Sequence, residues 1–277
     1  MNNLAVLEFV RELGNDDAAE SLHREALAMR RSLGLGEEVA ESLSNLAVVV
    51  SRKDRHAAIA LLREAETIIR ATRHEMHPDL ANNLHNLASM LHSIGEDAEA
   101  ELHYREALAI GRASLGEHPR VADTMDNLAT VLRDRGDEAE RLLREALAIR
   151  RGLFGEQHAD VAVSLSRLGT LFGLRGDLAG AEPFHREALA IRRTALGEEH
   201  PRVATTRGAL GETLIGLGRY REAEEVLLAA HALLLAAVGE EHTETQQLVH
   251  SLVELYDAWD KPDQAAEYRA LLHEREP

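Results

Sequence analysis

Apolar residues recur along this chain at alternating spacings of three and four positions. Leu80, Leu84, Leu87, Leu91 and Ile94 show the pattern, which places their side chains on one face of an α-helix. A short polar turn follows, and after it comes a second apolar segment with the text REALAMR or a close variant. The pattern predicts hairpins of two amphipathic helices, which we call the first and the second helix of each hairpin.

The second-helix segment repeats along the whole sequence. Its copies align in one column at Arg24, Arg63, Arg105, Arg144, Arg186 and Leu228. Self-similarity at a period of about 40 residues is the signature of a helical solenoid. We expect one solenoid over residues 1–277, with seven hairpins at approximately 1–34, 37–73, 77–115, 118–154, 158–196, 200–238 and 242–274. The later first helices should begin near Glu38, Pro78, Pro119, Ala159, Pro201 and Thr243.

The connections carry helix-ending and helix-starting residues. Within hairpins, glycines at Gly95, Gly136, Gly176 and Gly218 are expected to adopt the left-handed conformation that ends a helix. Between hairpins, the text LGEEHPRV from Leu196 to Val203 combines a helix-ending glycine with Pro201 in the first turn of the next helix. The predicted fold class is therefore all-α.

Composition narrows the classes of partner. The formal net charge is -17, aromatic residues make up 3% of the chain, and cysteine is absent. Nucleic-acid binding needs clustered cations and stacking platforms, so we expect no nucleic-acid partner. The longest apolar stretch, Val226 to Val238, is too short to span a bilayer, and no basic segment before an apolar block marks a secretory signal. We expect a cytoplasmic protein with no membrane contact.

Two stretches carry a resemblance to a known family. The text HPRVADTMDNLATVL from His118 and the text GRYREAEEVL from Gly218 resemble the tetratricopeptide repeat (TPR) family, in the longer form typical of kinesin light chains. The resemblance recurs in about six repeats and covers essentially the whole chain. It implies a right-handed superhelical solenoid of about seven helix-turn-helix repeats, with a concave groove lined by the first helices.

A narrower resemblance involves the last hairpin. The text LVELYDAWDKPDQAAEYRALL from Leu252 resembles the closing repeat of TPR regions attached to bacterial serine/threonine kinases. This implies a bacterial regulatory setting, in which the chain would act as a sensor or adaptor arm. The kinase motifs GxGxxG, HRD and DFG are absent from this sequence.

The TPR resemblance also implies where a ligand would bind. In the family, an Asn just before the central Leu of the first helix often bonds the backbone of an extended peptide. That column here contains Asn45, Asn86, Asn127 and Arg167, and the neighbouring groove positions are Asn82, His85, Ser89, Asp123, Asp126 and Thr130. The alternative is that the Asn residues bridge neighbouring first helices structurally.

The groove positions also constrain the ligand. Asp123 and Asp126 have no matching cluster of lysines, so a clamp for a ligand carboxylate is not supported. We expect the ligand to be a neutral or basic protein segment.

The sequence contains no motif that supports a catalytic or a metal-binding site. The text His74-Glu75-Met76-His77 places its histidines three apart, whereas a zinc-binding HExxH helix needs four. One His per repeat, at His77, His118, His158, His200 and His242, indicates a role in loop architecture. No GxSxG, P-loop or EF-hand spacing occurs. We expect no enzyme activity, no cofactor and no metal.

The sequence thus predicts a protein-binding module or scaffold, whose concave groove binds a peptide segment or a helix of a partner protein. An alternative is a self-association or spacer solenoid. Its contact would be an apolar N-terminal face formed by Leu4, Val6, Leu7, Phe9 and Val10, which could pair two copies as a homodimer.

Overall fold

The computed structural model describes residues 16–272, and within them it contains thirteen α-helices and no strand. The chain divides into two compact units, Met1–Leu132 and Arg133–Pro277, and each is described by itself. The prediction of an all-α fold is confirmed, whereas a single solenoid over residues 1–277 stays a prediction. The apolar N-terminal face, from Leu4 to Val10, lies outside the described residues.

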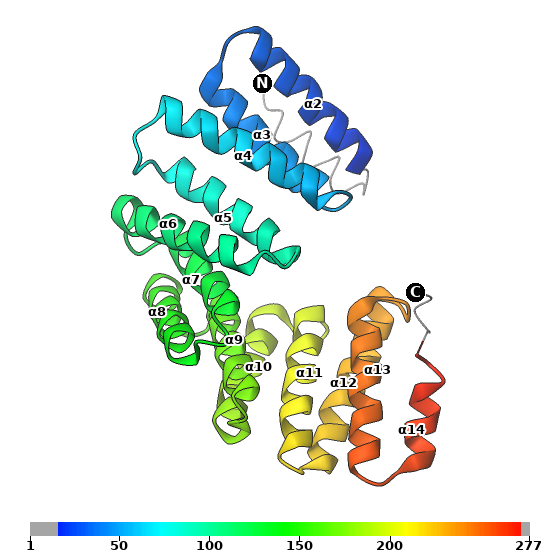
Figure 1. Cartoon of the computed structure of the whole chain (residues 1–277). Helices are drawn as coiled ribbons and strands as arrows, with labels where there is room; N and C mark the ends of the chain where they lie inside the picture. The colour runs from blue at the N-terminus through cyan, green and yellow to red at the C-terminus, as the bar shows by residue number, and fades with distance from the viewer. Residues whose placement is uncertain (1–15, 273–277) are drawn as a thin grey trace. The chain divides into compact units, whose positions relative to one another are not determined.

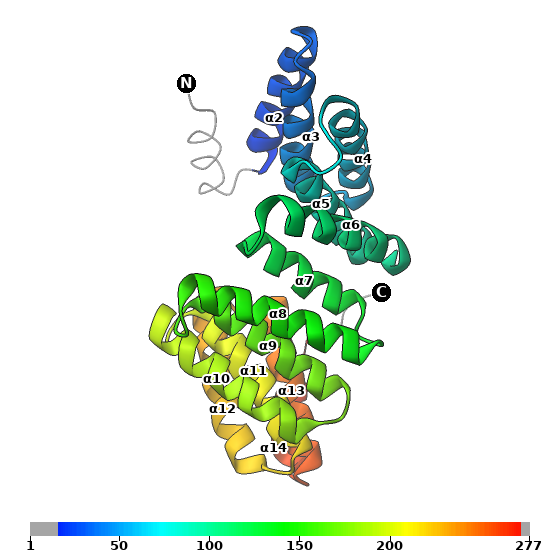
Figure 2. The same cartoon turned by 90° about the vertical axis from the view of Figure 1, so that its left-hand side faces the viewer.

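The first unit contains six described helices (Figure 1). They are α2 (Asp16–Ser32), α3 (Gly36–Val50), α4 (Arg55–Thr72), α5 (Pro78–Ser93), α6 (Asp97–Leu115) and α7 (Pro119–Val131). Each helix packs against the next along the chain, and Figure 2 shows α3 to α6 following one another in that order. The first helices α5 and α7 also contact each other directly.

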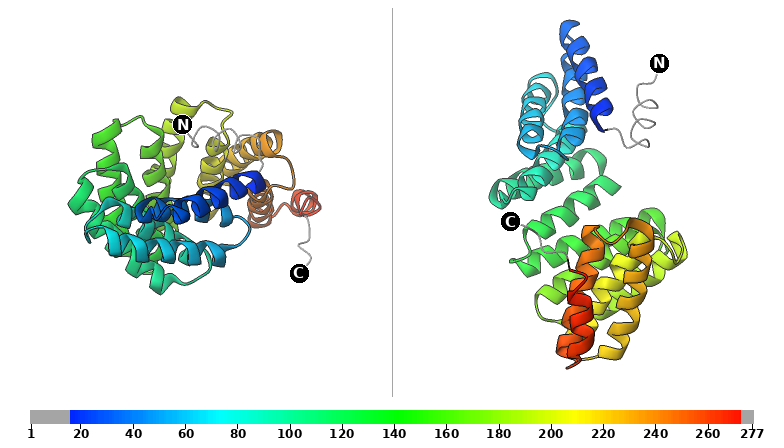
Figure 3. Two further views of the ribbon diagram at one scale, coloured as in Figure 1. Left: turned by 90° about the horizontal axis from the view of Figure 1, so that it is seen from above. Right: turned by 90° about the vertical axis from the view of Figure 1, so that its right-hand side faces the viewer.

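The second unit contains seven helices in its described part. They are α8 (Gly136–Phe154), α9 (Ala159–Leu174), α10 (Leu178–Leu196), α11 (Pro201–Gly216), α12 (Tyr220–Val238), α13 (Thr243–Ala258) and α14 (Pro262–Arg269). In the right panel of Figure 3, α13 in orange and α14 in red lie side by side, and the two helices are in contact. The boundary between the units falls in the turn between α7 and α8.

A histidine caps the start of five first helices. The ring Nδ1 accepts a hydrogen bond from the backbone N–H two residues later, at 3.1 to 3.3 Å, in His77, His118, His158, His200 and His242. A helix start leaves backbone donors without intrahelical partners, and a side-chain acceptor satisfies one of them. The predicted architectural role of these histidines is confirmed.

The glycine prediction is confirmed at three positions and wrong at one. Gly95, Gly176 and Gly218 have positive φ angles of 86°, 79° and 71°, whereas Gly136 is the first residue of α8. The cause is the length of the connection. The buried Ala100 comes five positions after Gly95, but the equivalent buried Ala139 comes only three positions after Gly136, so Gly136 becomes the first residue of the helix.

In two hairpins of the second unit, a glycine on the first helix lies in close contact with a larger side chain on the second helix. A Cβ added at Gly211 on α11 would lie 2.5 Å from Leu227 on α12, and one added at Gly169 on α9 would lie 2.6 Å from the ring of His185 on α10. His185 therefore occupies the place that Leu227 fills in the next hairpin. In these two hairpins the close approach of the helices depends on the missing Cβ of the glycine.

His185 is a polar residue in this apolar position. It is 3% exposed, and its Nδ1 atom has no hydrogen-bond partner in the described part of the chain. Burial, with a smaller contribution from the Arg192 guanidinium, lowers the pKa of His185 to about 4 from its ordinary value of 6.5. The imidazole is therefore neutral in the folded protein near pH 7.

We predict that His185→Leu stabilises the second unit. The change copies the Gly211 and Leu227 pairing and removes a buried polar atom without a partner, which typically costs about 1–3 kcal/mol. Since the unfolded chain binds the His185 proton at pH 6.5 and the folded chain only near pH 4, wild-type stability should fall between these values as the pH is lowered.

Urea unfolding of both proteins at pH 7 and pH 4.5 measures this effect. The wild type should lose about 2–3 kcal/mol more than His185→Leu does over that interval. An equal pH dependence of the two proteins would show that His185 is not buried as a neutral group.

We also predict that the cap of α7 depends on a side-chain acceptor. His118→Ala should lower the free energy of unfolding by about 1 kcal/mol, because it leaves the Arg120 N–H without its partner. His118→Asn should restore most of the loss, because Asn is a good N-cap. Thermal melting followed by circular dichroism measures the difference, and equal melting of the Ala and Asn variants would contradict the capping role.

Candidate functional site

Two adjoining hollows lie over the first helices of the first unit. The first hollow has a volume of about 480 Å³ and is lined mainly by α3 and α5, and the second has a volume of about 310 Å³ and lies over α5, α6 and α7. Asn82, Asn86 and Arg120 line both. The two hollows therefore form one continuous candidate binding surface.

On each of the first helices α3, α5 and α7, three positions at the same places in the repeat lie along this surface. They are spaced by three and four residues and so lie on one helical face. They are Glu38, Glu41 and Asn45 on α3, Asp79, Asn82 and Asn86 on α5, and Arg120, Asp123 and Asn127 on α7. All except Asn127 line at least one of the two hollows.

Three Asn side chains on this surface are unengaged. Within residues 16–272, the amides of Asn45, Asn82 and Asn86 make no side-chain hydrogen bond. Asn45 is exposed, and Asn82 and Asn86 are partly buried at the edge of the hollows. Each amide offers a donor group and an acceptor group, so the three can pair with polar atoms of a ligand.

Asn83, beside them in the sequence, has a structural role. It is 1% exposed, its Nδ2 donates to the Leu62 carbonyl at 2.9 Å, and its Oδ1 accepts from the Ser44 hydroxyl at 3.0 Å. These bonds link α5 to α4 and α3. Of the adjacent asparagines on α5, Asn83 is therefore structural and Asn82 remains on the binding surface.

His85 links α5 to α7. Its Nδ1 lies 2.9 Å from the Thr124 hydroxyl and its Nε2 lies 3.4 Å from Nδ2 of Asn127. The Thr124 hydroxyl already donates its proton to the Arg120 carbonyl at 2.8 Å. Thr124 must therefore accept from Nδ1–H, and Nε2 accepts from Asn127.

The electrostatic setting agrees with this neutral tautomer. Burial lowers the pKa of His85, the Asp123 carboxylate opposes the shift, and the Arg120 guanidinium adds to it. The ring also packs edge-on against Tyr104 of α6, with 5.6 Å between centroids. His85 both lines the second hollow and holds α7 against α5.

The remaining sequence-predicted residues are less exposed to a ligand. Asn127 donates to His85, so for this member the structural alternative describes its contact. Asp126 is 1% exposed and lines neither hollow, and a binding role for its carboxylate stays a prediction.

Three other predicted positions lie outside the two hollows. Thr130 donates to the Asp126 carbonyl of its own helix, and Ser89 is partly buried on α5. Arg167 belongs to α9 in the second unit. A binding role for these residues stays a prediction.

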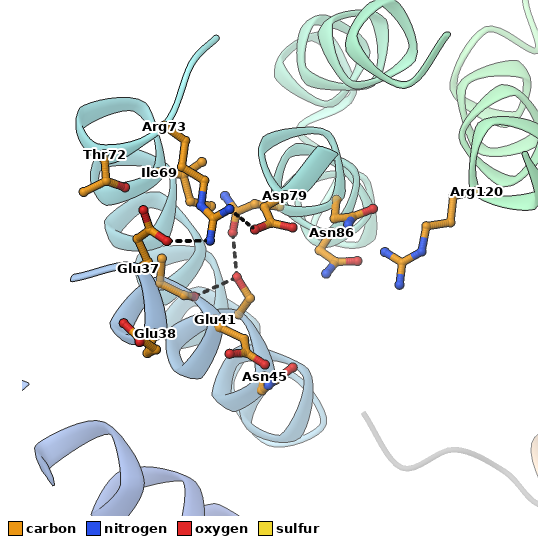
Figure 4. Close-up of a pocket in the computed structure, with 14 residues that line it drawn as sticks. Glu37, Glu38, Glu41, Asn45, Ile69, Thr72, Arg73, Asp79, Asn86 and Arg120 are labelled. Carbon is orange, nitrogen blue, oxygen red and sulfur yellow. Dashed lines mark hydrogen bonds and ion pairs between the residues drawn. The ribbon is translucent and has the colours of Figure 1, made fainter. Parts of the chain in front are cut away.

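Sequence reasoning missed two arginines of the surface. Arg73 ends α4, where its guanidinium bonds Glu37 at 3.0 Å and lies 3.4 Å from Asp79 (Figure 4). Arg120 follows Pro119 on α7 and lies three and seven residues before Asp123 and Asn127, which was a usable signal. Arg73 lies on a second helix and could not be assigned from first-helix spacing.

Across residues 16–272, no cluster of three or more His, Asp or Glu side chains has the arrangement of a metal site. No helix in the same range has the length and hydropathy of a membrane span.

The stacked helical hairpins define the class of the molecule, an α-helical repeat protein. Sequence models described as tetratricopeptide repeat match residues 1–34, 38–113, 79–137, 120–194 and 174–236. The chain belongs to the tetratricopeptide repeat family. No curated protein sequence gives a significant match.

Solved structures extend the comparison. BtubC (BKLC) from P. vanneervenii is 27% identical over 81% of this chain and 92% of that chain, with a TM-score of 0.70. The TPR-like repeats of a putative kinesin light chain from Podosopora anserina are 23% identical over 73% of this chain and 98% of that chain, with a TM-score of 0.63. The predicted kinesin-light-chain type of repeat is confirmed.

A third likeness concerns the fold alone. The Rap conjugation gene regulator of plasmid pLS20, solved in complex with the Phr* peptide, is 16% identical over 82% of this chain and 61% of that chain, with a TM-score of 0.61.

Because Asn83 is structural and Asn86 lies on the binding surface, we predict that replacing them changes the free energy of unfolding by different amounts. Asn83→Ala should lower the free energy of unfolding by about 2 kcal/mol, because it removes the buried bonds from Asn83 to the Leu62 carbonyl and the Ser44 hydroxyl. Asn86→Ala should change it by less than about 0.5 kcal/mol. Urea unfolding of both variants measures the difference, and similar losses would mean that Asn86 also has a structural role.

Proposed function

We propose that this protein binds an extended segment of a partner protein across the first helices of its first unit. The observation that carries the proposal is the set of unengaged amides, Asn45, Asn82 and Asn86, beside two adjoining hollows. An extended peptide exposes one N–H and one C=O per residue, and an amide side chain pairs with both. Such a surface can bind the backbone of a peptide whatever most of the peptide's side chains are.

The size and nature of the hollows support a peptide. Volumes of about 480 and 310 Å³ are in the range of pockets that hold several side chains. The lining is predominantly polar, and the second hollow has a floor of small side chains at Ala81, Ala107 and Gly111. A protein of similar fold, the Rap regulator of pLS20, was solved with a peptide bound, which supports peptide binding as a use of this architecture.

The cellular setting of the protein is inferred from its sequence, because the side-chain contacts in the structure do not bear on it. We infer a non-catalytic scaffold in the cytoplasm of a bacterium, which acts as a sensor or adaptor arm in signalling. Pairing of two copies through the N-terminal apolar face is the alternative mode of action.

We predict that the Asn82→Ala, Asn86→Ala variant loses the natural partner. Each change removes a hydrogen-bonding group from the surface, and the pair should weaken binding at least roughly tenfold, or ~1.4 kcal/mol. The measurement is affinity capture from a native cell lysate, followed by titration of the captured protein against each variant.

Thr67→Ala is the matched control. Thr67 is exposed on α4, donates only to the Arg63 carbonyl of its own helix, and lines neither hollow. The partner should bind Thr67→Ala as it binds the wild type. Capture of the same proteins by all three baits, with equal affinity, would refute the proposal.

A further inference from the structure

Accessible carboxylates and a cation that is unpaired among the described residues lie at opposite ends of the first hollow. Glu37, Glu38 and Glu41 project from α3 at one end of the first hollow, and Arg120 projects from α7 at the other, beside Asn86 (Figure 4). The uncharged amides of α5 lie between them. Arg73 also lines the first hollow, where it is paired with Glu37 and Asp79, and Asp123 lines the second hollow three residues after Arg120. The charges of the first hollow that a ligand can engage are therefore acidic at the α3 end and basic at Arg120.

The acidic end has carboxylates that a ligand can engage. Glu37 is paired with Arg73, but Glu38 has no side-chain partner among the residues the structure describes. Glu41 is exposed and lies 3.7 Å from the half-buried Arg30, whose guanidinium also bonds the Glu38 carbonyl and the Ser42 hydroxyl. An ion pair this long with an exposed carboxylate contributes little stability, so Glu41 can exchange its partner at small cost.

The basic end has a single cation, and the backbone fixes its place. Arg120 is exposed, and its guanidinium makes no hydrogen bond or ion pair within the described residues. Its N–H is held by the His118 ring and its carbonyl by the Thr124 hydroxyl. A guanidinium matches a carboxylate with two parallel hydrogen bonds, so an acidic side chain is its best partner.

We propose that the ligand is an extended peptide that carries a Lys or Arg facing Glu38 and Glu41 and an Asp or Glu facing Arg120. The inference rests on the proposed function and specifies its ligand. The amides of Asn82 and Asn86 pair with the backbone between the two charges. A peptide bound in the reverse direction would place like charges together at both ends, so the same surface fixes the polarity of binding.

The helix spacing sets the distance between the two ligand charges. The bond from Ser44 to Asn83 makes α3 and α5 neighbours, and the contact of His85 with Thr124 does the same for α5 and α7. Packed helices lie about 8–10 Å apart, so α3 and α7 are separated by about 16–20 Å. An extended chain covers about 3.3–3.6 Å per residue, so the charges should lie about five residues apart.

The test uses a displayed library of random peptides as the probe. The library is selected in parallel on the wild type, on Arg120→Glu, on Glu38→Lys with Glu41→Lys, and on Asn82→Ala with Asn86→Ala. Arg55→Glu is the matched control, because Arg55 is an exposed arginine at the start of α4 that lines neither hollow. Circular dichroism checks that each variant is folded.

Wild type and Arg55→Glu should enrich peptides with a basic and an acidic residue about five positions apart in one fixed order. Arg120→Glu should lose only the acidic preference, and the Glu38 and Glu41 double variant only the basic one. Peptides that depend on Asn82 and Asn86 but carry no such charge pair would overturn the inference and leave the proposed function standing. No enrichment, or enrichment that ignores the Asn substitutions, would overturn both.

Discussion

Close packing between the two helices of each hairpin determines which residues a ligand can reach. On α5 the apolar face, with Leu84, Leu87 and Ala88, is fully buried. Side chains on other faces of the same helix stay accessible, so burying the apolar face leaves Asn82 and Asn86 to line the hollows. The binding surface is thus the part of each first helix that packing leaves over, and its chemistry can vary without a change in the core.

The sequence contained enough to predict the helices and their starts. Pro78, Pro119 and Pro201 are the first helical residues where they were expected, because a proline in the first turn loses no hydrogen bond. Gly136 misled the prediction, since its neighbours in sequence resemble those of the other turn glycines. Its backbone conformation depends on the number of residues before the next buried alanine, and the shorter step from Arg105 to Arg144 than from Arg144 to Arg186 was the signal of this shorter turn.

The candidate site was predictable as a face but not residue by residue. Asn45, Asn86 and Asn127 occupy the same position in successive repeats. Asn127 nevertheless contacts the ring of His85, whereas the amides of the other two make no side-chain hydrogen bond in the described structure. The contacts of the neighbouring helix decide this difference, and spacing within one helix cannot report them. Arg73 was missed for the same reason, since it reaches the first hollow from a second helix.

The central claim is that the Asn82 and Asn86 face of α5 contacts a partner protein. The most direct measurement places a photo-crosslinking amino acid at position 86, and in a parallel chain at position 67, in cells of the native source. We expect a discrete crosslinked protein from position 86 and none from position 67. No adduct at position 86, or the same adducts from both positions, would contradict it.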